Sequence, residues 1–206
     1  MTTELYRLYR PKRFKDVIGQ QAAVKMLTSF IEKATVPHFL MFTGSSGCGK
    51  TTLARILATK LKCVPSDFCE INAAESRGID TIREIKQRMG LSTMNGGMCR
   101  FYLFDEGHKL SSDAQNCLLK MLEDTPDHVY FVIATTDPHK LIATIRSRAT
   151  EIKVTPLSAA DQILSMRTVL DRAEKKHPSD SVLERIAEVA DGNARKALVI
   201  LNQVID

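Results

Sequence analysis

The chain has 206 residues and a formal net charge of +5, with 44% hydrophobic and 26% charged residues. This ordinary globular balance allows one α/β domain and a smaller second domain. The sequence contains no apolar run near the ~20 residues of a membrane helix, and its N-terminus lacks an apolar signal core. We therefore expect a cytoplasmic protein that is neither secreted nor bound to a membrane. The modest basic excess permits a nucleic-acid partner without requiring one.

Short apolar runs alternate with helical patterns over the first three quarters of the chain. Strands are predicted over residues 37–44, 68–73, 100–106, 129–136 and 150–157. Helices are predicted over residues 21–34, 50–62, 78–89 and 111–124. The alternation indicates a parallel sheet covered by helices on both faces, which is a three-layer α/β/α fold. After Pro156 the pattern changes to three helices without a strand, so we expect an α/β domain of residues 1–156 and a small all-α domain of residues 157–206.

Residues 44–51, GSSGCGKT, match the phosphate-binding pattern G-x-x-x-x-G-K-[ST] between a predicted strand and a predicted helix. Glycines let backbone N–H groups surround phosphate oxygens, and the helix N-terminus adds partial positive charge. Lys50 is expected to reach the β- and γ-phosphates, and Thr51 to give a hydroxyl ligand to Mg²⁺. The expected phosphate-binding residues are Gly44, Ser45, Ser46, Gly47, Cys48, Gly49, Lys50, Thr51 and Thr52.

Two acids end the predicted strand 100–106, where a phosphate-binding loop needs a carboxylate for its metal. Asp105 is expected to hold Mg²⁺ from its outer coordination shell, and Glu106 to polarise an attacking water as general base. This acid pair favours water as the nucleophile, and therefore a nucleoside triphosphatase over a small-molecule kinase. The five cysteines form no C-x-x-C pair and join no histidine cluster, so no zinc site is predicted.

These segments, in this order, resemble the AAA+ ATPase subunits of sliding-clamp loaders, which include the bacterial gamma/tau subunits and the replication factor C small subunits. The resemblance covers essentially the whole chain. The segments that carry it are LYRPKRFKDVIGQ (8–20), AAESRGIDTIRE (73–84), the long run from LFDEGH to DPHKL (103–141), TIRSRA (144–149) and DGNARKALVILNQ (191–203). It implies an AAA+ fold, use of ATP and Mg²⁺, and a lid formed by residues 157–206.

The resemblance also assigns the rest of the ATP site. It implies an adenine pocket in the segment 5–20, formed by Leu8, Tyr9, Arg10, Val17, Ile18 and Gly19. Thr136 matches the family's first sensor, expected to contact the γ-phosphate or the attacking water, and Arg195 matches the second sensor on the lid. Arg148 matches the arginine of the Ser-Arg-Cys motif, which reaches into the ATP site of the neighbouring subunit.

Three departures from the family pattern stand out. Ala149 replaces the cysteine of the Ser-Arg-Cys motif, but the chemistry needs no thiol there. The stretch between the P-loop helix and the next strand has no room for the zinc module of gamma/tau, so zinc is not implied. Gly107 stands where bacterial relatives have valine, and we expect it to loosen the turn after Glu106.

The resemblance implies three kinds of partner: other loader subunits in a ring or spiral, a sliding clamp, and primer-template DNA. Candidate contacts to the DNA backbone lie near two helix starts, at Arg77, Arg83, Lys109 and Ser112. The alternative for these residues is a solvated basic face. The helix 111–124 resembles the family's clamp-facing element, with the alternative that its apolar residues form only core.

We therefore expect an ATPase motor subunit that uses ATP binding to open and place a clamp on primed DNA and hydrolysis to release it. The alternatives are another AAA+ DNA-remodelling ATPase, of the branch-migration or replication-maintenance type, or a loader subunit that binds ATP without hydrolysing it. Family members continue into a helical collar, which this chain lacks. The chain is either a shortened form of a longer protein, which we expect, or a protein that naturally has no collar. A shortened form should bind ATP and hydrolyse it poorly without its neighbours.

Overall fold

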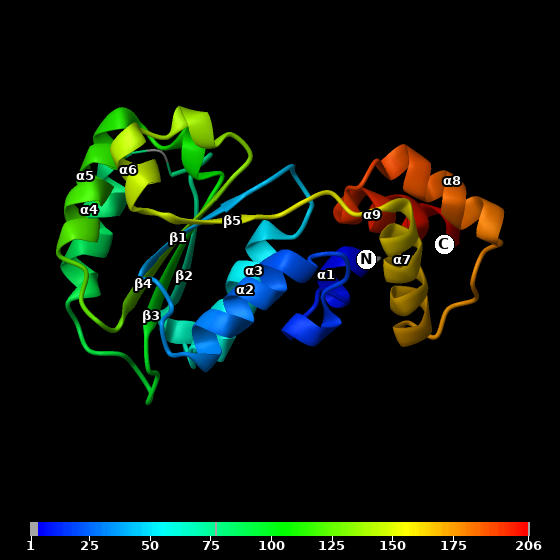
Figure 1. Ribbon diagram of the computed structural model, residues 1–206, viewed down its shortest axis with the longest axis horizontal. Helices are drawn as coiled ribbons and strands as arrows, with labels where there is room; N and C mark the ends of the chain where they lie inside the picture. The colour runs from blue at the N-terminus through cyan, green and yellow to red at the C-terminus, as the bar shows by residue number, and fades with distance from the viewer. Residues whose placement is uncertain (1–3, 77, 206) are drawn as a thin grey trace.

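A computed structural model describes residues 4–76 and 78–205. Its sheet has five strands in the order β2-β3-β4-β1-β5, and every neighbouring pair is parallel. The strands are β1 (Phe39–Thr43), β2 (Phe68–Asn72), β3 (Arg100–Asp105), β4 (Val129–Thr135) and β5 (Thr150–Lys153). Helices cover both faces of this sheet (Figure 1), so the predicted three-layer α/β/α class is confirmed.

Nine α-helices and four short 3₁₀ helices lie in the described ranges. The α-helices are α1 (Leu5–Leu8), α2 (Gln21–Glu32), α3 (Lys50–Lys60), α4 (Ile79–Met89), α5 (Ser112–Glu123), α6 (Ala143–Arg148), α7 (Ala159–Arg172), α8 (Asp180–Ala190) and α9 (Ala194–Ile205). The 3₁₀ helices are η1 (Phe14–Asp16), η2 (Pro65–Asp67), η3 (Gly107–Lys109) and η4 (Pro138–Lys140). No helix in these parts of the chain is both long and apolar enough to cross a membrane.

The central strands are apolar over most of their length, and both of their faces are buried. In β3, Phe101 and Leu103 pack toward α2 and α3, whereas Tyr102 and Phe104 pack toward α4 and α5. Successive side chains of a strand point to opposite faces, so one run of sequence supplies two cores. The same alternation continues in β1 and β4, and it holds the sheet between its two helical layers.

The last three helices build a core of their own around Leu170, Leu183 and Leu201. The Ser158 side chain accepts a hydrogen bond from the Asp161 N–H and so caps the start of α7. Leu5 of α1 is buried in this same core, and α1 lies beside α9 (Figure 1). The N-terminal segment therefore joins the helical unit and the sheet, which it contacts a few residues later.

A buried carboxylate anchors the loop between α4 and β3. The Asp67 side chain is 0% exposed; its Oδ2 accepts the Met94 N–H at 2.7 Å, and its Oδ1 lies 3.5 Å from Arg100 Nη2. Arg100 in turn donates to the Ser92 carbonyl at 2.8 Å. The Asp67 side chain thus holds both the loop at Met94 and the start of β3 at Arg100. No motif in the sequence indicates these contacts.

Removal of this carboxylate should destabilise the fold. Asp67→Ala leaves the nearly buried Arg100 cation without its counter-charge, so we expect the free energy of unfolding to fall by about 3–5 kcal/mol. Urea denaturation measures the change. The matched control is Asp80→Ala, which breaks only the exposed Asp80–Arg83 pair and should leave stability unchanged. Equal losses in the two variants would contradict the assignment.

Candidate functional site

The phosphate-binding loop and the acid pair meet at one edge of the sheet. The loop follows β1, the acids end β3, and β4 lies between these two strands. Because all three strands are parallel, their carboxyl ends share that edge. The Thr51 hydroxyl donates to Asp105 Oδ2 at 3.1 Å. Residues 54 positions apart in the sequence are therefore in direct contact.

The loop has the backbone that its glycines permit. Gly44, Gly47 and Gly49 have φ values of +148°, +71° and +111°. A Cβ at Gly44 would lie 2.0 Å from the Val154 carbonyl oxygen, so the loop passes too close to the strand end for any side chain. The Lys50 side chain folds back into the loop, and its Nζ donates to the carbonyls of Gly44 and Ser45 at 2.9 and 2.8 Å.

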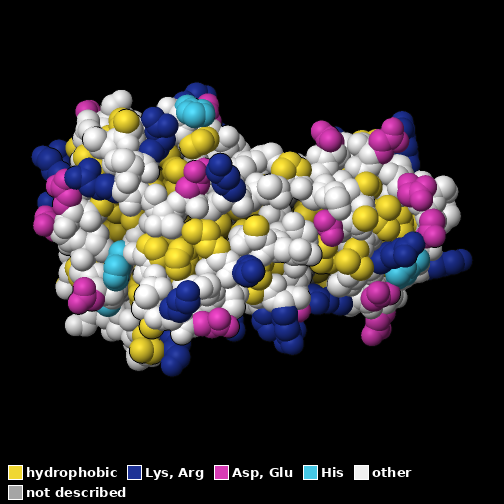
Figure 2. All heavy atoms as spheres, viewed as in Figure 1, with side chains coloured by type: hydrophobic (Ala, Val, Ile, Leu, Met, Phe, Trp, Pro, Cys, Tyr) yellow, Lys and Arg dark blue, Asp and Glu magenta, His cyan; other side chains and the backbone are white. Residues whose placement is uncertain are grey.

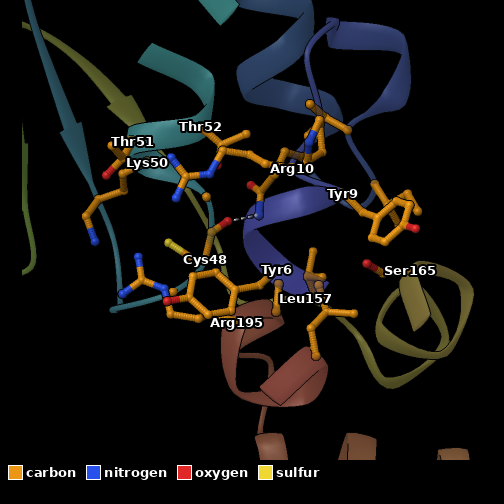
Figure 3. A pocket seen from close by; sticks show the side chains of 18 of the residues that line it. Tyr6, Tyr9, Arg10, Cys48, Lys50, Thr51, Thr52, Leu157, Ser165 and Arg195 are labelled. Atoms are coloured by element: carbon orange, nitrogen blue, oxygen red, sulfur yellow. Dashed lines mark hydrogen bonds between the residues drawn. The ribbon is translucent and has the colours of Figure 1, made fainter. Parts of the chain in front are cut away.

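A cavity of about 360 Å³ runs from this loop to the helical unit. Figure 3 shows Lys50, Thr51 and Arg195 at one end and Tyr9 and Ser165 at the other. The first end carries cations and hydroxyls that suit phosphates, and the second is lined by rings and aliphatic groups that suit a base. The lining residues that were expected from the sequence are Tyr9, Arg10, Val17, Ile18, Ser46, Gly47, Cys48, Gly49, Lys50, Thr51, Thr52, Asp105, Glu106 and Arg195.

Some expected residues lie outside this lining. Leu8 ends α1 with 54% of its surface exposed, because the helix turns Tyr6 and Tyr9 inward instead. Gly19 packs on the helical unit, where a Cβ would lie 2.4 Å from Leu157. Thr136 is exposed just after β4. Gly44 and Ser45 do not line the cavity, and their carbonyls accept hydrogen bonds from Lys50 Nζ.

Other lining residues were not expected from the sequence. Tyr6 precedes Tyr9 by three residues, a spacing that places both on one helix face, so it was accessible to sequence reasoning. Asn72 ends β2 in register with Asp105, but only the pairing of strands shows this. Ser165, Thr168 and Arg172 of α7 also line the cavity, and they belong to no motif.

Cations outnumber carboxylates in a cleft beside the phosphate end of the cavity. This second cleft, of about 740 Å³, shares Thr51 and Asp105 with the cavity. This cleft is lined by Arg7, Arg10, Lys12, Arg55 and Arg195, against which stand the carboxylates of Glu70 and Asp105. Burial, followed by the nearby Arg55 charge, lowers the pKa of Arg10. Such an excess of cations favours a polyanion at this end.

The acid pair lies on a tight turn. Glu106 has a left-handed φ of +52°, and its N–H donates to Asp105 Oδ1 at 3.0 Å. Gly107 was expected to loosen this turn, but the structure shows the opposite role. A Cβ at Gly107 would lie 2.5 Å from Ile133 Cγ2, so the glycine lets the turn pack directly on β4.

Arg148 ends α6 and lies outside the cavity of its own chain. It donates to Glu123 Oε1 at 2.8 Å, and 43% of its side chain is exposed. From this position it is available to another molecule, as a residue acting in trans must be. Arg146 precedes it on the same short helix.

The described candidate DNA contacts lie on α4, on η3 and at the start of α5, and α4 and α5 pack against each other. Arg83 is exposed and paired with Asp80 at 3.0 Å, while Lys109 and Ser112 are exposed at η3 and the start of α5. Arg77 lies outside the described residues. Figure 2 shows acidic and basic side chains interspersed over the α4–α5 end on the visible face. Their role in DNA binding remains a prediction.

The donor set fits a nucleotide with Mg²⁺. The Thr51 hydroxyl and the Asp105 carboxylate are hard oxygen donors already in contact, which is the kind of ligand that Mg²⁺ takes alongside phosphates. In the hydrogen bonds described above, the Lys50 ammonium donates to two neutral carbonyls of the loop. A phosphate oxygen is a stronger partner for that charge.

Comparisons with known proteins find relatives of this chain. A family model described as "DNA polymerase III, delta subunit" matches residues 65–158, and one described as "Magnesium chelatase, subunit ChlI" matches residues 13–99. The chain is 36% identical to the DNA polymerase III subunit tau of Bacillus subtilis, over 98% of this chain and 39% of that protein. It is 34% identical to the replication factor C small subunit of Methanococcus vannielii, over 94% of this chain and 62% of that protein.

A solved structure shares the fold at lower sequence identity. The RuvB Holliday junction branch migration motor of Thermotoga maritima superposes with a TM-score of 0.78 at 22% identity, over 95% of this chain and 64% of that one. At this identity the likeness shows the fold alone. The chain thus spans between about two fifths and two thirds of the lengths of these relatives.

Loss of the loop lysine should weaken nucleotide binding. Lys50→Met removes a charge that is 5% exposed at the phosphate end, so we expect affinity for a fluorescent ATP analogue to fall about 10- to 100-fold. Lys60→Met, at the exposed end of the same helix, is the control and should bind normally. Equal affinities in the two variants would exclude Lys50 from the binding site.

Proposed function

We propose that this chain, which is similar to the DNA polymerase III tau subunit and the replication factor C small subunit, is the AAA+ ATPase motor subunit of a sliding-clamp loader. In this proposal ATP binding lets the assembled loader open a clamp and place it on primed DNA, and hydrolysis releases the clamp during replication in the cytoplasm. Because the chain spans only part of its relatives, this activity and its partners are inferred for the longer protein.

The observation that carries the ATPase proposal is the Thr51–Asp105 contact, with Glu106 beside it and Lys50 in the same cavity. Lys50 binds the β- and γ-phosphates, and Thr51 and Asp105 hold Mg²⁺. An ion held there would supply positive charge to offset that of the phosphates. Glu106 lies next in the chain and faces the same cavity, where it orients and polarises the attacking water.

The base end of the cavity supports recognition of adenine. Tyr9 supplies an aromatic ring, and Val17 and Ile18 supply aliphatic contacts from the N-terminal segment. Thr136, though exposed here, and Arg195 are proposed as the two sensors of the γ-phosphate. We retain the absence of zinc as a prediction.

Residues 157–206 act in this proposal as a lid that responds to nucleotide. Arg195 of α9 lines the cavity, and a Cβ at Gly47 would lie 2.1 Å from Asn193 Oδ1. The phosphate-binding loop and the start of α9 are thus in close approach. A nucleotide in the cavity contacts both elements, which couples the lid angle to the state of the ATP site.

Hydrolysis depends on assembly through Arg148. An arginine finger donated in trans stabilises charge on the transferring phosphoryl group and contributes orders of magnitude to the rate. Arg148 is exposed on the structure and outside its own cavity, which supports this role. The isolated chain should therefore bind ATP and hydrolyse it slowly.

Two alternatives make different predictions. A branch-migration or replication-maintenance motor has the same fold, but it would respond to DNA without a clamp. A loader subunit that does not hydrolyse ATP has no need of Lys50, Thr51, Asp105 and Glu106 together. The presence of the complete set in one cavity favours the hydrolase.

Turnover by the assembled protein distinguishes these functions. We expect ATP hydrolysis by the full-length protein with its partner subunits to rise synergistically with primed DNA and sliding clamp. Arg148→Ala should remove most of that stimulation, by about 10³-fold or more, without changing ATP affinity. Arg185→Ala, an exposed arginine on α8, is the matched control. Stimulation by DNA alone, indifferent to the clamp, would favour a remodelling motor.

The general base has a separate test. Glu106→Gln keeps the size and polarity of the side chain but cannot accept a proton, so kcat should fall about 10²- to 10⁴-fold. Affinity for ATP should be retained, since Lys50 and the loop are untouched. Steady-state turnover and equilibrium binding measure the two effects, and undiminished turnover would remove Glu106 from this role.

A further inference from the structure

His108 lies two residues after the proposed general base, with a hydrogen-bond partner at one ring nitrogen and the Glu106 carboxylate near the other. Its side chain is 8% exposed. The Nδ1 atom lies 3.0 Å from Thr135 Oγ1, and the Nε2 atom lies 3.6 Å from Glu106 Oε2. One imidazole therefore stands between the end of β4 and the Glu106 carboxylate.

Close packing of the backbone at Gly107 brings these side chains together. Gly107 has no Cβ, so η3 lies directly on Ile133 of β4. That contact brings His108 to Thr135, two residues further along the strand. Thr135 is fully buried, and its Oγ1 also accepts the Asp137 N–H at 3.1 Å.

One proton arrangement satisfies every member of this chain. Thr135 Oγ1 accepts from the Asp137 N–H, which leaves its own hydroxyl proton for His108 Nδ1. With Nδ1 accepting, the imidazole carries its proton on Nε2, directed at the Glu106 carboxylate. The series Asp137, Thr135, His108 and Glu106 thus has a donor facing an acceptor at each step.

We propose that His108, braced by Thr135, is a positioning residue that holds the Glu106 carboxylate in place for water activation. This inference rests on the proposed function of Glu106. The carboxylate needs such a support because Glu106 lies on a left-handed turn, with 29% of its side chain exposed. Catalytic hydrogen bonds are often long before substrate binds and shorten in the reacting complex, which accommodates the 3.6 Å separation.

The contacts of His108 and Thr135 also connect the Glu106 carboxylate to the segment that carries Thr136. Thr136 lies between Thr135, which supports His108, and Asp137, whose N–H supports Thr135. A shift of this segment when a γ-phosphate is contacted is therefore transmitted to Glu106 through three hydrogen-bonding groups. Misplacement of a reacting group by about 1 Å is enough to cost 10²-fold in rate.

The test uses three variants in the full-length protein assembled with its partners, primed DNA and clamp. His108→Phe removes both nitrogens but keeps the ring, and Thr135→Val removes only the hydroxyl. His108→Gln keeps an N–H group near the position of Nε2. The matched control is His139→Phe, an exposed histidine on η4.

We expect His108→Phe to lower kcat about 10- to 100-fold with the KM for ATP unchanged. His108→Gln should recover at least a third of wild-type kcat. Thr135→Val should lower kcat in the same direction, and the double variant Thr135→Val/His108→Phe should be no slower than His108→Phe alone, because the two residues act in series. His139→Phe should match the wild type.

Turnover of His108→Phe within about twofold of wild type, in a preparation where Glu106→Gln abolishes hydrolysis, would overturn this inference and leave the proposed function intact. Full turnover by Glu106→Gln would instead refute the proposed general base. A lowered urea midpoint for His108→Phe, together with a raised KM and no recovery in His108→Gln, would show a structural role and also overturn the inference.

Discussion

The hydroxyl–carboxylate contact between Thr51 and Asp105 is the point on which the site depends. It exists because β1, β4 and β3 are parallel neighbours, which places the loop after β1 and the acids after β3 at one edge of the sheet. Both faces of these strands are buried beneath helices, which holds the sheet in place. The sheet thus keeps the Thr51 hydroxyl beside the Asp105 carboxylate.

The rest of the site lies between units that are distant in the sequence. Gln20 joins them: its buried amide donates to the carbonyls of Thr155 and Cys48 and accepts the Thr155 N–H. One side chain therefore links the N-terminal segment, the phosphate-binding loop and the exit from β5. Burial of such an amide is tolerated because its hydrogen bonds are made. The base end of the cavity is positioned by this network and by the packing of α1 on α9.

Local patterns predicted the motifs and the fold class, while tertiary contacts decided what the sequence left open. The P-loop and the acids at the end of a strand are contiguous, so their chemistry is visible in the residues themselves. Tyr6 shares a helix face with Tyr9, yet the direction of that face, which leaves Leu8 exposed, depends on packing against α9. The contact of His108 with Thr135 depends on how η3 rests on β4, and no spacing in the sequence reports it.

We propose that one cavity, built from the sheet edge, the N-terminal segment and the helical unit, holds ATP with its metal. A crystal structure of the chain with a non-hydrolysable ATP analogue and Mn²⁺ tests it most directly. We predict anomalous density for the metal beside Thr51 and Asp105, phosphates at the start of α3, and the base against Tyr9, Val17 and Ile18. A nucleotide bound elsewhere, or a metal remote from Asp105, would contradict the account.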